Sequence, residues 1–596
     1  MNTVVVSFTQ ESVNKHRSSD REGDFLFEEL PLTDKESEVE LMKMSGAEIV
    51  VETLIEQGIK TVFGFPGGMV IDIYDQLLKK SGKIEHVLTA HEEGAAHAAD
   101  GYARATGRIG VVIATSGPGA TNLVTGIATA YLDSVPMLAI TGNVPSDMIG
   151  RDSFQEIDIA GITLPITKHN FIVHDIKDLA DTIREAIVIA TSGRPGPVLV
   201  DIPKDIQVQT AVFEKAPKVK KKPIKDADEK TVNEAVRMIM ESSRPYIYFG
   251  GGAVRAEAGE LIAELADKID AAMGSSMMGL SEIPTSNPRY LGMQGMHGHF
   301  ASSKAMHKSD LVIALGVRFS DRATGNTEKF SGGAQKIHID ADASEINKNI
   351  EVNLSAACDI CDFLKKLIAK VPVQKHEAWM AKIAKLKTQE AEFDDPTFLP
   401  ELAVKKISSV TAPDTCLVTD VGQHQMWAAQ FYEFEKKKTW ISSGGLGTMG
   451  FGLGAAIGAS FGSGKKSVLI TGDGSFAMNL NELATAVAYN VPLTIVIMNN
   501  GVLGMVRQLQ TMFYNKQYSA TTLDRKTDFV KLAEAMGAKG FKADGIEEFG
   551  KVFEQAYKTE GPTLIDLTVD KDAFVLPMVP PGGTYDRIIC EKGDKL

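Results

Sequence analysis

Short apolar runs recur along the chain and are separated by longer stretches in which apolar and polar positions alternate at helical spacing. In the first third of the chain, the apolar runs lie at 61–65, 110–115 and 136–141, and helical spacing lies at 45–57 and 121–132. Runs that are this short and uniformly apolar predict strands buried on both faces, which is typical of parallel sheets. Their alternation with helices predicts a doubly wound parallel α/β sheet.

The same alternation returns twice. A middle block has an apolar run at 245–249 and further predicted strands at 310–315 and 335–340, and a later block has apolar runs at 467–471 and 493–498 with a predicted helix, 479–488, between them. The basic, proline-containing stretch 215–223 predicts a linker, and the charged stretch 375–392 predicts a helix. We therefore predict three doubly wound parallel-sheet domains, at 44–212, 226–371 and 395–570, with an N-terminal extension at 1–43 and a C-terminal tail at 571–596.

The composition is that of a large globular chain. With 596 residues, 44% hydrophobic and 23% charged, three domains of ordinary size are expected. The formal net charge of −14 argues against nucleic acid as a partner. No run of 18 apolar residues occurs, so we expect no transmembrane helix. The N-terminal extension is too acidic for a typical transit peptide, and we expect a cytoplasmic location.

The chain has four cysteines, which do not make a disulfide framework. Cys358 and Cys361 are spaced as a CxxC pair, but no second pair or histidine cluster accompanies them. This pattern favours two buried thiols over a zinc or redox site.

Two polar side chains follow neighbouring apolar runs in the third block. Asp473 lies in Gly472-Asp473-Gly474 directly after one run, and Asn500 follows the next. Because the carboxyl ends of parallel strands lie at one edge of a sheet, the two side chains are expected to lie near each other. Two hard oxygen donors with an incomplete ligand set suit Mg²⁺ bound to phosphate oxygens. The alternative is an ordinary turn in which Asp473 caps a helix.

An acidic side chain is placed similarly in the first block. Glu92 lies just beyond the apolar pair Val87-Leu88, at the start of an alanine-rich helix. A carboxylate at this position can serve the helix dipole and have no other role. A buried carboxyl group can instead share a proton with a heterocyclic nitrogen. The spacing alone leaves both interpretations open.

Taken together, these residues resemble the signature of the thiamine-diphosphate enzymes. Further motifs narrow the resemblance to the catalytic subunits of acetohydroxyacid synthase (acetolactate synthase), and it extends from about residue 44 to about residue 582. The motifs are Thr115-Ser-Gly-Pro-Gly-Ala-Thr-Asn122, Phe154-Gln-Glu156, Ser192-Gly-Arg-Pro-Gly-Pro197, Gly295-Met-His-Gly298, Val421-Gly-Gln-His-Gln-Met-Trp427, Gly444-Gly-Leu-Gly-Thr-Met449 and Met578-Val-Pro-Pro581.

The resemblance implies both a fold and a reaction. The three domains would bind the pyrimidine ring of the cofactor, FAD, and the diphosphate with Mg²⁺, in chain order. The enzyme would be a transferase that decarboxylates pyruvate and condenses the two-carbon unit with a second 2-ketoacid, pyruvate or 2-ketobutyrate. The product, 2-acetolactate or 2-aceto-2-hydroxybutyrate, would enter branched-chain amino acid biosynthesis.

For thiamine diphosphate, the resemblance implies roles in the first and third domains. Glu92 would hydrogen-bond the pyrimidine ring and favour the tautomer that removes the thiazolium proton. Asp473, Asn500 and the carbonyl of Val502 would hold Mg²⁺. The other implied contacts to this cofactor are Gly422, Gln423, His424, Gly447, Met449, Gly472, Gly474 and Met505.

For the substrates, the resemblance implies that Arg322 receives the carboxylate of the second 2-ketoacid, a task that suits a bidentate guanidinium. Gln155 and Lys204 match residues near the active-site entrance. Considered alone, each of the three is equally consistent with a surface side chain that has no specific role.

The middle domain would bind FAD. The triplet Gly250, Gly251 and Gly252 after a predicted strand is by itself a weak dinucleotide signal. The loop 318–322 is the stronger argument, because it matches the flavin-containing branch of the family. The other implied flavin contacts are Arg194, Met296, His297, Arg318, Asp340 and Asp359. Because the reaction involves no net redox change, the flavin would have a structural role.

Four positions depart from the usual pattern of the family. Leu509 stands where most members carry Trp, a residue associated with preference for 2-ketobutyrate, so we predict a weakened preference. Met69 replaces Ala and would narrow the entrance, and Ser320 replaces Asp in the arginine loop. Gly454 replaces Pro and would loosen the start of a helix. None of these changes removes an implied cofactor ligand.

The resemblance also implies an assembly. The cofactor would lie between the first domain of one chain and the third domain of another, in a homodimer or homotetramer, with a small regulatory subunit usual in the family. Two alternatives remain. A pyruvate oxidase or decarboxylase-type enzyme would lack the 318–322 loop in this form, and a non-catalytic homologue would have lost Glu92, Asp473 or Asn500, all of which are present.

Overall fold

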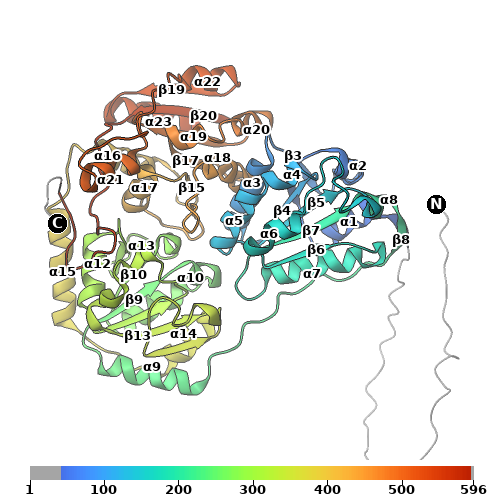
Figure 1. Ribbon diagram of the computed structural model, residues 1–596. Helices are drawn as coiled ribbons and strands as arrows, with labels where there is room; N and C mark the ends of the chain where they lie inside the picture. The colour runs from blue at the N-terminus through green and yellow to red at the C-terminus, as the bar shows by residue number, and fades with distance from the viewer. Residues whose placement is uncertain (1–41, 592–596) are drawn as a thin grey trace, which may run out of the picture.

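The computed structural model describes residues 42–591 and shows three α/β units, each built on a six-stranded parallel sheet (Figure 1). In Figure 1 the first unit is blue to teal, the middle unit green to yellow, and the third unit orange to red. The predicted fold class is confirmed. Of the predicted N-terminal extension, residues 1–41 lie outside the described residues, and the last two residues already belong to a strand.

The first sheet has the strand order β3-β2-β4-β5-β7-β6. Its apolar runs are buried on both faces, since Val111 and Ile113 face one core cluster while Val112 and Ala114 face another. The strands are β2 (Thr61–Phe65), β3 (Glu85–Leu88), β4 (Gly110–Ala114), β5 (Met137–Asn143), β6 (His169–Ile172) and β7 (Pro197–Pro203). The helices are α1 (Gly46–Glu56), α2 (Ile71–Lys79), α3 (Glu92–Thr106), α4 (Pro118–Asn122), α5 (Val124–Leu132), α6 (Ile159–Thr163), α7 (Leu179–Thr191) and α8 (Lys204–Val208).

The middle sheet has the order β11-β10-β9-β12-β13-β14. Residues 214–228, which include the predicted linker, contain neither helix nor strand and lead into it. The strands are β9 (Pro245–Phe249), β10 (Ala272–Ser275), β11 (Tyr290–Met293), β12 (Leu311–Leu315), β13 (Gln335–Asp340) and β14 (Leu354–Ala357). The helices are α9 (Glu229–Glu241), α10 (Gly251–Ala256), α11 (Gly259–Lys268), α12 (Phe300–Lys308), α13 (Asp321–Thr324), α14 (Ile360–Lys370) and α15 (Glu377–Ala391).

The third sheet has the order β16-β15-β17-β18-β20-β19. The strands are β15 (Cys416–Thr419), β16 (Trp440–Ile441), β17 (Ser467–Gly472), β18 (Leu493–Asn499), β19 (Lys539–Ala543) and β20 (Pro562–Thr568). The helices are α16 (Leu399–Val410), α17 (Gln423–Phe431), α18 (Phe451–Ser463), α19 (Asp473–Phe476), α20 (Glu482–Ala488), α21 (Gly504–Phe513), α22 (Phe529–Ala535) and α23 (Ile546–Lys558).

The structure differs from the predicted elements in three places. An antiparallel pair, β1 (Met42–Ser45) with β8 (Thr210–Phe213), was not predicted and joins the two ends of the first unit. The helix predicted at 121–132 is two helices, α4 and α5, interrupted at Leu123. The crossover helix between β17 and β18 begins at Glu482 rather than at 479, because the Asn479 side chain turns away to donate to the Gly450 carbonyl, 3.0 Å away.

The first and third units pack together through α3 and α18, which lie side by side near the centre of Figure 1. Both helices are rich in Ala and Gly, so their backbones approach closely. A Cβ at Gly101 would overlap the carbonyl oxygen of Ala455, and a Cβ at Gly458 would overlap that of Ala98. Because the side chains at this crossing are small, the two backbones are in direct contact, and this contact fixes the distance between the two units.

The C-terminal tail returns to the middle unit. The backbone N–H of Val579 donates to the Met296 carbonyl at 2.7 Å, and the buried Tyr585 hydroxyl donates to the Ala323 carbonyl. The tail therefore braces the two loops that carry His297 and Arg322. No helix among residues 42–591 is both long and apolar enough to cross a membrane.

Candidate active site at the junction of the three units

A cavity of about 1260 Å³ lies where the three units meet. Its walls come from the ends of α5 and α7 in the first unit and from the carboxyl ends of β9, β12 and β13 in the middle unit. The third unit contributes the start of α17, the loop 443–449 and the first half of α21. Ligand cavities usually measure about 300–1,000 Å³, so this one can hold a molecule of dinucleotide size. Carboxyl ends of parallel strands are the usual ligand-binding edge of such sheets.

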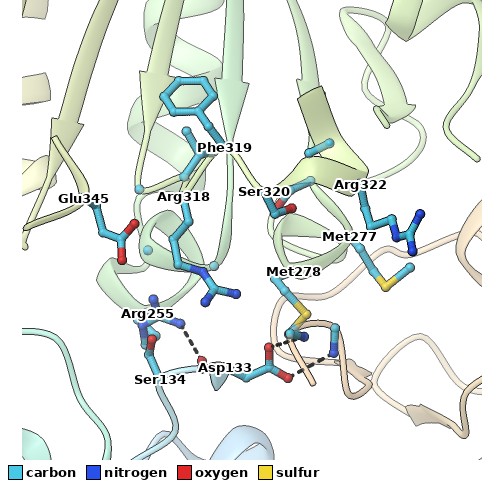
Figure 2. Close-up of a pocket in the computed structure, with 18 of the residues that line it drawn as sticks. Asp133, Ser134, Arg255, Met277, Met278, Arg318, Phe319, Ser320, Arg322 and Glu345 are labelled. Atoms are coloured by element: carbon cyan, nitrogen blue, oxygen red, sulfur yellow. Dashed lines mark hydrogen bonds between the residues drawn. The ribbon is translucent and has the colours of Figure 1, made fainter. Parts of the chain in front are cut away.

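Three guanidinium groups gather on one side of this cavity. Arg255, on α10, and Arg318, in the loop after β12, line its wall (Figure 2). Arg194, in the loop after α7, lines it as well. Burial within the molecule lowers the pKa of Arg255 to about 10, and the charges of Arg194 and Arg318 add to that effect, while Asp340 opposes it. Arg255 and Arg318 line the cavity wall, and neither pairs with a carboxylate among residues 42–591, whereas Arg194 pairs with Glu345 and Asp342. Two guanidinium groups without a carboxylate partner favour an anionic ligand.

The middle unit also supplies carboxylates at the ends of two elements. Asp340 ends β13, and burial raises the pKa of its carboxyl group to about 6. Asp359 caps α14 by accepting the backbone N–H of Asp362 at 2.9 Å. Arg194 donates to the Glu345 carboxylate at 2.5 Å, and this contact joins the first unit to the middle one. Within the first unit, Arg194 also donates to the Ser134 hydroxyl at 2.8 Å.

The glycine triplet after β9 serves backbone packing as well as the cavity. Gly251 and Gly252 lie on the wall, whereas Gly250 does not. A Cβ at Gly252 would lie 2.5 Å from the Cα of Gly316, and a Cβ at Gly250 would lie 2.7 Å from its carbonyl oxygen. The triplet thus lets the β9 and β12 ends come together beneath the cavity.

The arginine loop after β12 points one guanidinium at the cavity rim. Phe319 is buried with a φ of +48° and anchors the loop, while the side chain of Arg322 is 70% exposed. Its nearest described partners are the Met296 sulfur at 3.7 Å and the Asp321 carboxylate at 3.8 Å. Burial, together with the charge of Arg322, lowers the pKa of His297 to about 4. Arg322 therefore keeps most of its donors available to a ligand.

Leu509 and Ser320, two of the four departures from the family pattern, lie on the cavity wall. Leu509 is joined there by a group of flexible apolar side chains from the middle and third units, namely Met277, Met278, Met449, Met505 and Val506. Met69 lies elsewhere, beside Thr115, and Gly454 lies at the α3–α18 crossing with Gly94. The narrowing expected from Met69 therefore concerns the Glu92 side of the protein and not this cavity.

Asp473 and Asn500 emerge from adjacent parallel strands, in which Gly472 pairs with Met498. Burial raises the pKa of the Asp473 carboxyl to about 6, although it accepts the backbone N–H groups of Gly474 and Asn500. The Asn500 amide accepts the N–H of Val502 at 3.1 Å and donates to Gln423 at 3.3 Å. A buried carboxylate with a raised pKa is stabilised by a cation placed next to it.

The start of α17 lies over this edge of the sheet. Gln423 donates to the Gln508 side chain at 3.0 Å and to the Ala573 carbonyl at 2.7 Å, which fixes its amide. Burial lowers the pKa of His424 to about 3, and its Nε2 atom is buried with no hydrogen-bond partner within residues 42–591. An orphaned buried nitrogen beside a helix start is a position that a phosphate group can satisfy. Among the described residues, no group of three or more His, Cys, Asp or Glu side chains is arranged to hold a metal, so amide, carbonyl and phosphate oxygens would have to complete this donor set.

Glu92, Gln155 and Lys204 lie together at the carboxyl edge of the first sheet. Glu92 is the first residue of α3 and 8% exposed, and it accepts the Asn122 amide N–H at 2.9 Å. A Cβ at Gly117 would lie 2.9 Å from the Cα of Gln155, and the Lys204 ammonium pairs with Asp72 at 2.6 Å. The large cavity has none of these three residues on its wall.

Most residues expected to contact the flavin therefore lie together on the cavity wall, with Gly422, Gly447, Met449 and Met505 opposite them. Asp473, Asn500, Gln423 and His424 form a second group at the third sheet, and Glu92 belongs to a third group.

Sequence reasoning missed three residues, Asp133, Arg255 and Asp420. Asp420 follows β15 as Asp473 follows β17, which is a signal that the strand pattern contained. It accepts the N–H groups of Gly450 and Gly452 at 2.8 and 3.1 Å and so fixes the start of α18.

The CxxC pair was predicted to be two buried thiols, and one of the two is only half-buried. Cys358 is buried and Cys361 half-buried, and the Cys361 thiol donates to the Ala256 carbonyl at 3.2 Å. Burial raises the pKa of Cys358 to about 11, so this thiol is a poor metal ligand or nucleophile.

Comparison with known proteins agrees with this architecture. Three family models match, described as the N-terminal TPP binding domain (residues 44–162), the central domain (232–367) and the C-terminal TPP binding domain (420–567) of thiamine pyrophosphate enzymes. The chain is 43% identical to acetolactate synthase of Mycobacterium bovis, with 93% of each chain covered. It is 43% identical to the probable acetolactate synthase large subunit of Methanocaldococcus jannaschii (92% and 95% covered) and 40% identical to the acetolactate synthase large subunit of Haemophilus influenzae (93% and 99% covered). The chain therefore belongs to the thiamine pyrophosphate enzymes and, within them, to the acetolactate synthase large-subunit family.

Proposed function

We propose that this chain decarboxylates pyruvate and joins the two-carbon unit to a second 2-ketoacid, giving 2-acetolactate or 2-aceto-2-hydroxybutyrate. The observation that carries the proposal is that Glu92, Asp473 and Asn500 each follow a parallel strand, in a chain that resembles acetolactate synthases over more than nine-tenths of its length. When bound, thiamine diphosphate supplies a carbon nucleophile for the keto group and an electron sink for loss of the carboxylate.

In this proposal the third unit holds the diphosphate. Asp473, Asn500 and the Val502 carbonyl bind Mg²⁺, because a hard dication compensates the buried Asp473 carboxylate. Gly422, Gln423 and His424 lie against the phosphates, where the unpartnered Nε2 of His424 gains a hydrogen-bond partner. Gly472 and Gly474 leave room for the anion, and Gly447, Met449 and Met505 contact the aminopyrimidine ring.

Glu92 has the task of proton transfer at the pyrimidine ring. Its position at the start of α3 and its hydrogen bond from Asn122 hold one carboxylate oxygen in place and leave the other available. Arg322 binds the carboxylate of the second 2-ketoacid, since its guanidinium is exposed at the cavity rim with few described partners. Gln155 and Lys204, at the edge that carries Glu92, border the approach to it.

The cavity accepts FAD. Arg194, Arg255 and Arg318 supply the positive charge that a dinucleotide diphosphate requires, and Gly251 and Gly252 allow it to approach the backbone. Gly250, Met296, His297, Asp340 and Asp359 complete the flavin site. Since the reaction is redox-neutral, the flavin acts as a structural element between the units.

We further propose that two chains complete each active site. In support, the Glu92 group is absent from the wall of the cavity that holds Met449 and Leu509. Large apolar side chains are exposed near both groups, including Phe154 at 83% and Met478 at 56%, and a second copy would cover them. Relatives named as large subunits point to a smaller regulatory partner. The free thiols of Cys358, Cys361 and Cys416 suit the cytoplasm.

A pyruvate-only assay with and without added thiamine diphosphate, Mg²⁺ and FAD tests reaction and cofactors together. We expect acetolactate to form only with thiamine diphosphate and Mg²⁺, and the flavin to raise activity without being consumed. Formation of acetaldehyde, or of acetate or acetyl phosphate with reduction of the flavin, would assign the chain to another thiamine pyrophosphate enzyme.

Active-site complementation tests the shared site. Glu92→Gln and Asp473→Asn chains are each expected to be inactive. If each site combines Glu92 of one chain with Asp473 of the other, mixed dimers contain one intact site, and an equimolar mixture regains about a quarter of the wild-type activity. A site contained within one chain would leave the mixture inactive.

A further inference from the structure

The loop between β16 and α18 is held by an acidic side chain from the first unit. The carboxylate of Asp133 accepts the backbone N–H of Gly445 at 2.7 Å and that of Gly444 at 3.0 Å (Figure 2). Asp133 lies at the end of α5 and is buried. Its own backbone carbonyl accepts a hydrogen bond from Arg255 at 3.3 Å, on the cavity side of the same residue.

Asp133 is itself fixed by a buried ion network. Arg104, near the end of α3, pairs with Asp133 at 2.9 Å and with Asp100 at 2.5 Å, and donates to the Ser442 carbonyl at 2.9 Å. The carboxylates of Asp100 and Asp133 have no solvent-exposed surface. A buried carboxylate that is satisfied on both oxygens holds its partners in one geometry.

Within the loop, the backbone N–H of Thr448 donates to the Ser443 hydroxyl at 3.1 Å, but three of its positions are glycine. Gly444, Gly445 and Gly447 have no side chains to pack, and Gly447 has a φ of +71°. A Cβ at Gly445 would lie 2.8 Å from the Asp133 carboxylate, so only glycine permits this approach. A second contact across the same boundary joins the hydroxyl groups of Thr448 and Thr129 at 2.7 Å. The conformation of residues 444–448 therefore depends on acceptors supplied by α5.

We infer that Asp133 is a positioning residue that sets the loop 442–449, and through it the contact of Gly447 and Met449 with the aminopyrimidine ring. The inference rests on the proposed function, because that function places the ring against this loop. The side chain of Asp133 acts on the thiamine diphosphate side, whereas its backbone carbonyl faces the flavin side. A side-chain substitution should therefore separate the two cofactors.

The test is Asp133→Asn, with Asp178→Asn as the matched control. Asp178 is an exposed acid of the same unit that does not line the cavity, and its substitution makes the same change of charge without touching the loop. An amide has one acceptor oxygen and one donor group, so it can accept only one of the two glycine N–H groups well. We expect the dissociation constant of thiamine diphosphate, measured by calorimetry with Mg²⁺ present, to rise about tenfold in Asp133→Asn.

Three further readouts distinguish a positioning role of Asp133 from a general loss of structure. The amides of Gly444 and Gly445 should lose protection from hydrogen exchange in Asp133→Asn. The affinity for FAD should stay within about twofold, since the carbonyl that meets Arg255 is unchanged, and kcat at saturating thiamine diphosphate should stay within about threefold. Gly445→Ala approaches the same contact from the loop side and should weaken thiamine diphosphate binding in the same way, even if Asp133→Asn does not fold.

The inference fails if Asp133→Asn and Gly445→Ala bind thiamine diphosphate as the wild type does, or if Asp178→Asn weakens binding to the same extent. A wild-type chain that binds no thiamine diphosphate would instead refute the proposed function.

Discussion

Replacing Gly458 by Ala should destabilise the protein even though Ala is the better helix former. Gly458 lies inside α18 with ordinary helical backbone angles, so propensity alone predicts a gain of about 1 kcal/mol. The packing predicts the opposite. The new Cβ would fall well inside the 3.0 Å limit that Cβ contacts do not cross, and the atom that it meets is the backbone carbonyl of Ala98 on α3.

A backbone carbonyl in a helix cannot rotate away as a side chain can. The two helices would therefore have to move apart by about 1 Å or more, at a crossing where both faces are close-packed. Overpacking of this kind costs about 1–3 kcal/mol, and the rigid neighbour places this case at or above the upper end. After the gain in propensity is subtracted, the net loss of stability is about 2 kcal/mol. The affinity for thiamine diphosphate should fall as well, since α3 begins at Glu92 and α18 begins two residues after Met449.

Thermal unfolding of Gly458→Ala and Gly462→Ala, followed by circular dichroism, measures the effect. Gly462 lies one turn later on α18, where a Cβ would meet the side-chain methyl of Thr106 at 2.8 Å, and this side chain can rotate. The same gain in propensity applies to both variants, so the difference between their midpoints isolates the backbone clash. The reasoning is wrong if Gly458→Ala unfolds at or above the temperature of Gly462→Ala.

Three further predictions follow from the site. Leu509→Trp should raise the preference for 2-ketobutyrate over pyruvate about tenfold, because the larger side chain adds apolar contact on the cavity wall beside the substrate. An unchanged ratio of the two products in a competition assay would contradict this. The affinity for Mg²⁺ should fall about tenfold per pH unit below pH 6, because the pKa of Asp473 is raised to about 6 and the cation binds only the ionised carboxylate. Equal affinities at pH 5 and pH 7.5 in calorimetry would refute Asp473 as a magnesium ligand. Glu92→Gln should retain thiamine diphosphate binding but lose at least about 100-fold in kcat, and full turnover would exclude Glu92 as the proton-transfer group.

The sheets could be predicted because their signal is local. The runs at 61–65 and 245–249 match β2 and β9 residue for residue, since strands buried on both faces are mostly apolar. The predicted strand 335–340 also has the bounds of β13, although only its central residues are buried. The nearness of Asp473 and Asn500 could also be predicted, because both follow strands that turned out to be neighbours. Chain order and strand period were sufficient for these results.

The residues that were missed depend on contacts between units. Arg255 is one cation among many in the sequence, and it becomes distinctive only because Arg194 and Arg318 arrive from other elements. Asp133 likewise looks like the end of an amphipathic helix until the third unit places Gly444 and Gly445 against it. No local pattern encodes these distances, since they arise from the packing of elements that are far apart in the chain.

The glycine-rich helix pair links these separate observations. α3 carries Glu92 at its first residue, meets α18 along its middle, and supplies Asp100 and Arg104 to the Asp133 network near its end. α18 in turn follows Met449, whose loop Asp133 holds. A shift of α3 relative to α18 would therefore move the proton-transfer group and loosen the loop together. Alanine and glycine at this crossing let the two backbones touch, and a backbone contact does not rearrange as a contact between flexible side chains does. Close backbone packing therefore keeps Glu92 and the loop before α18 at a fixed separation.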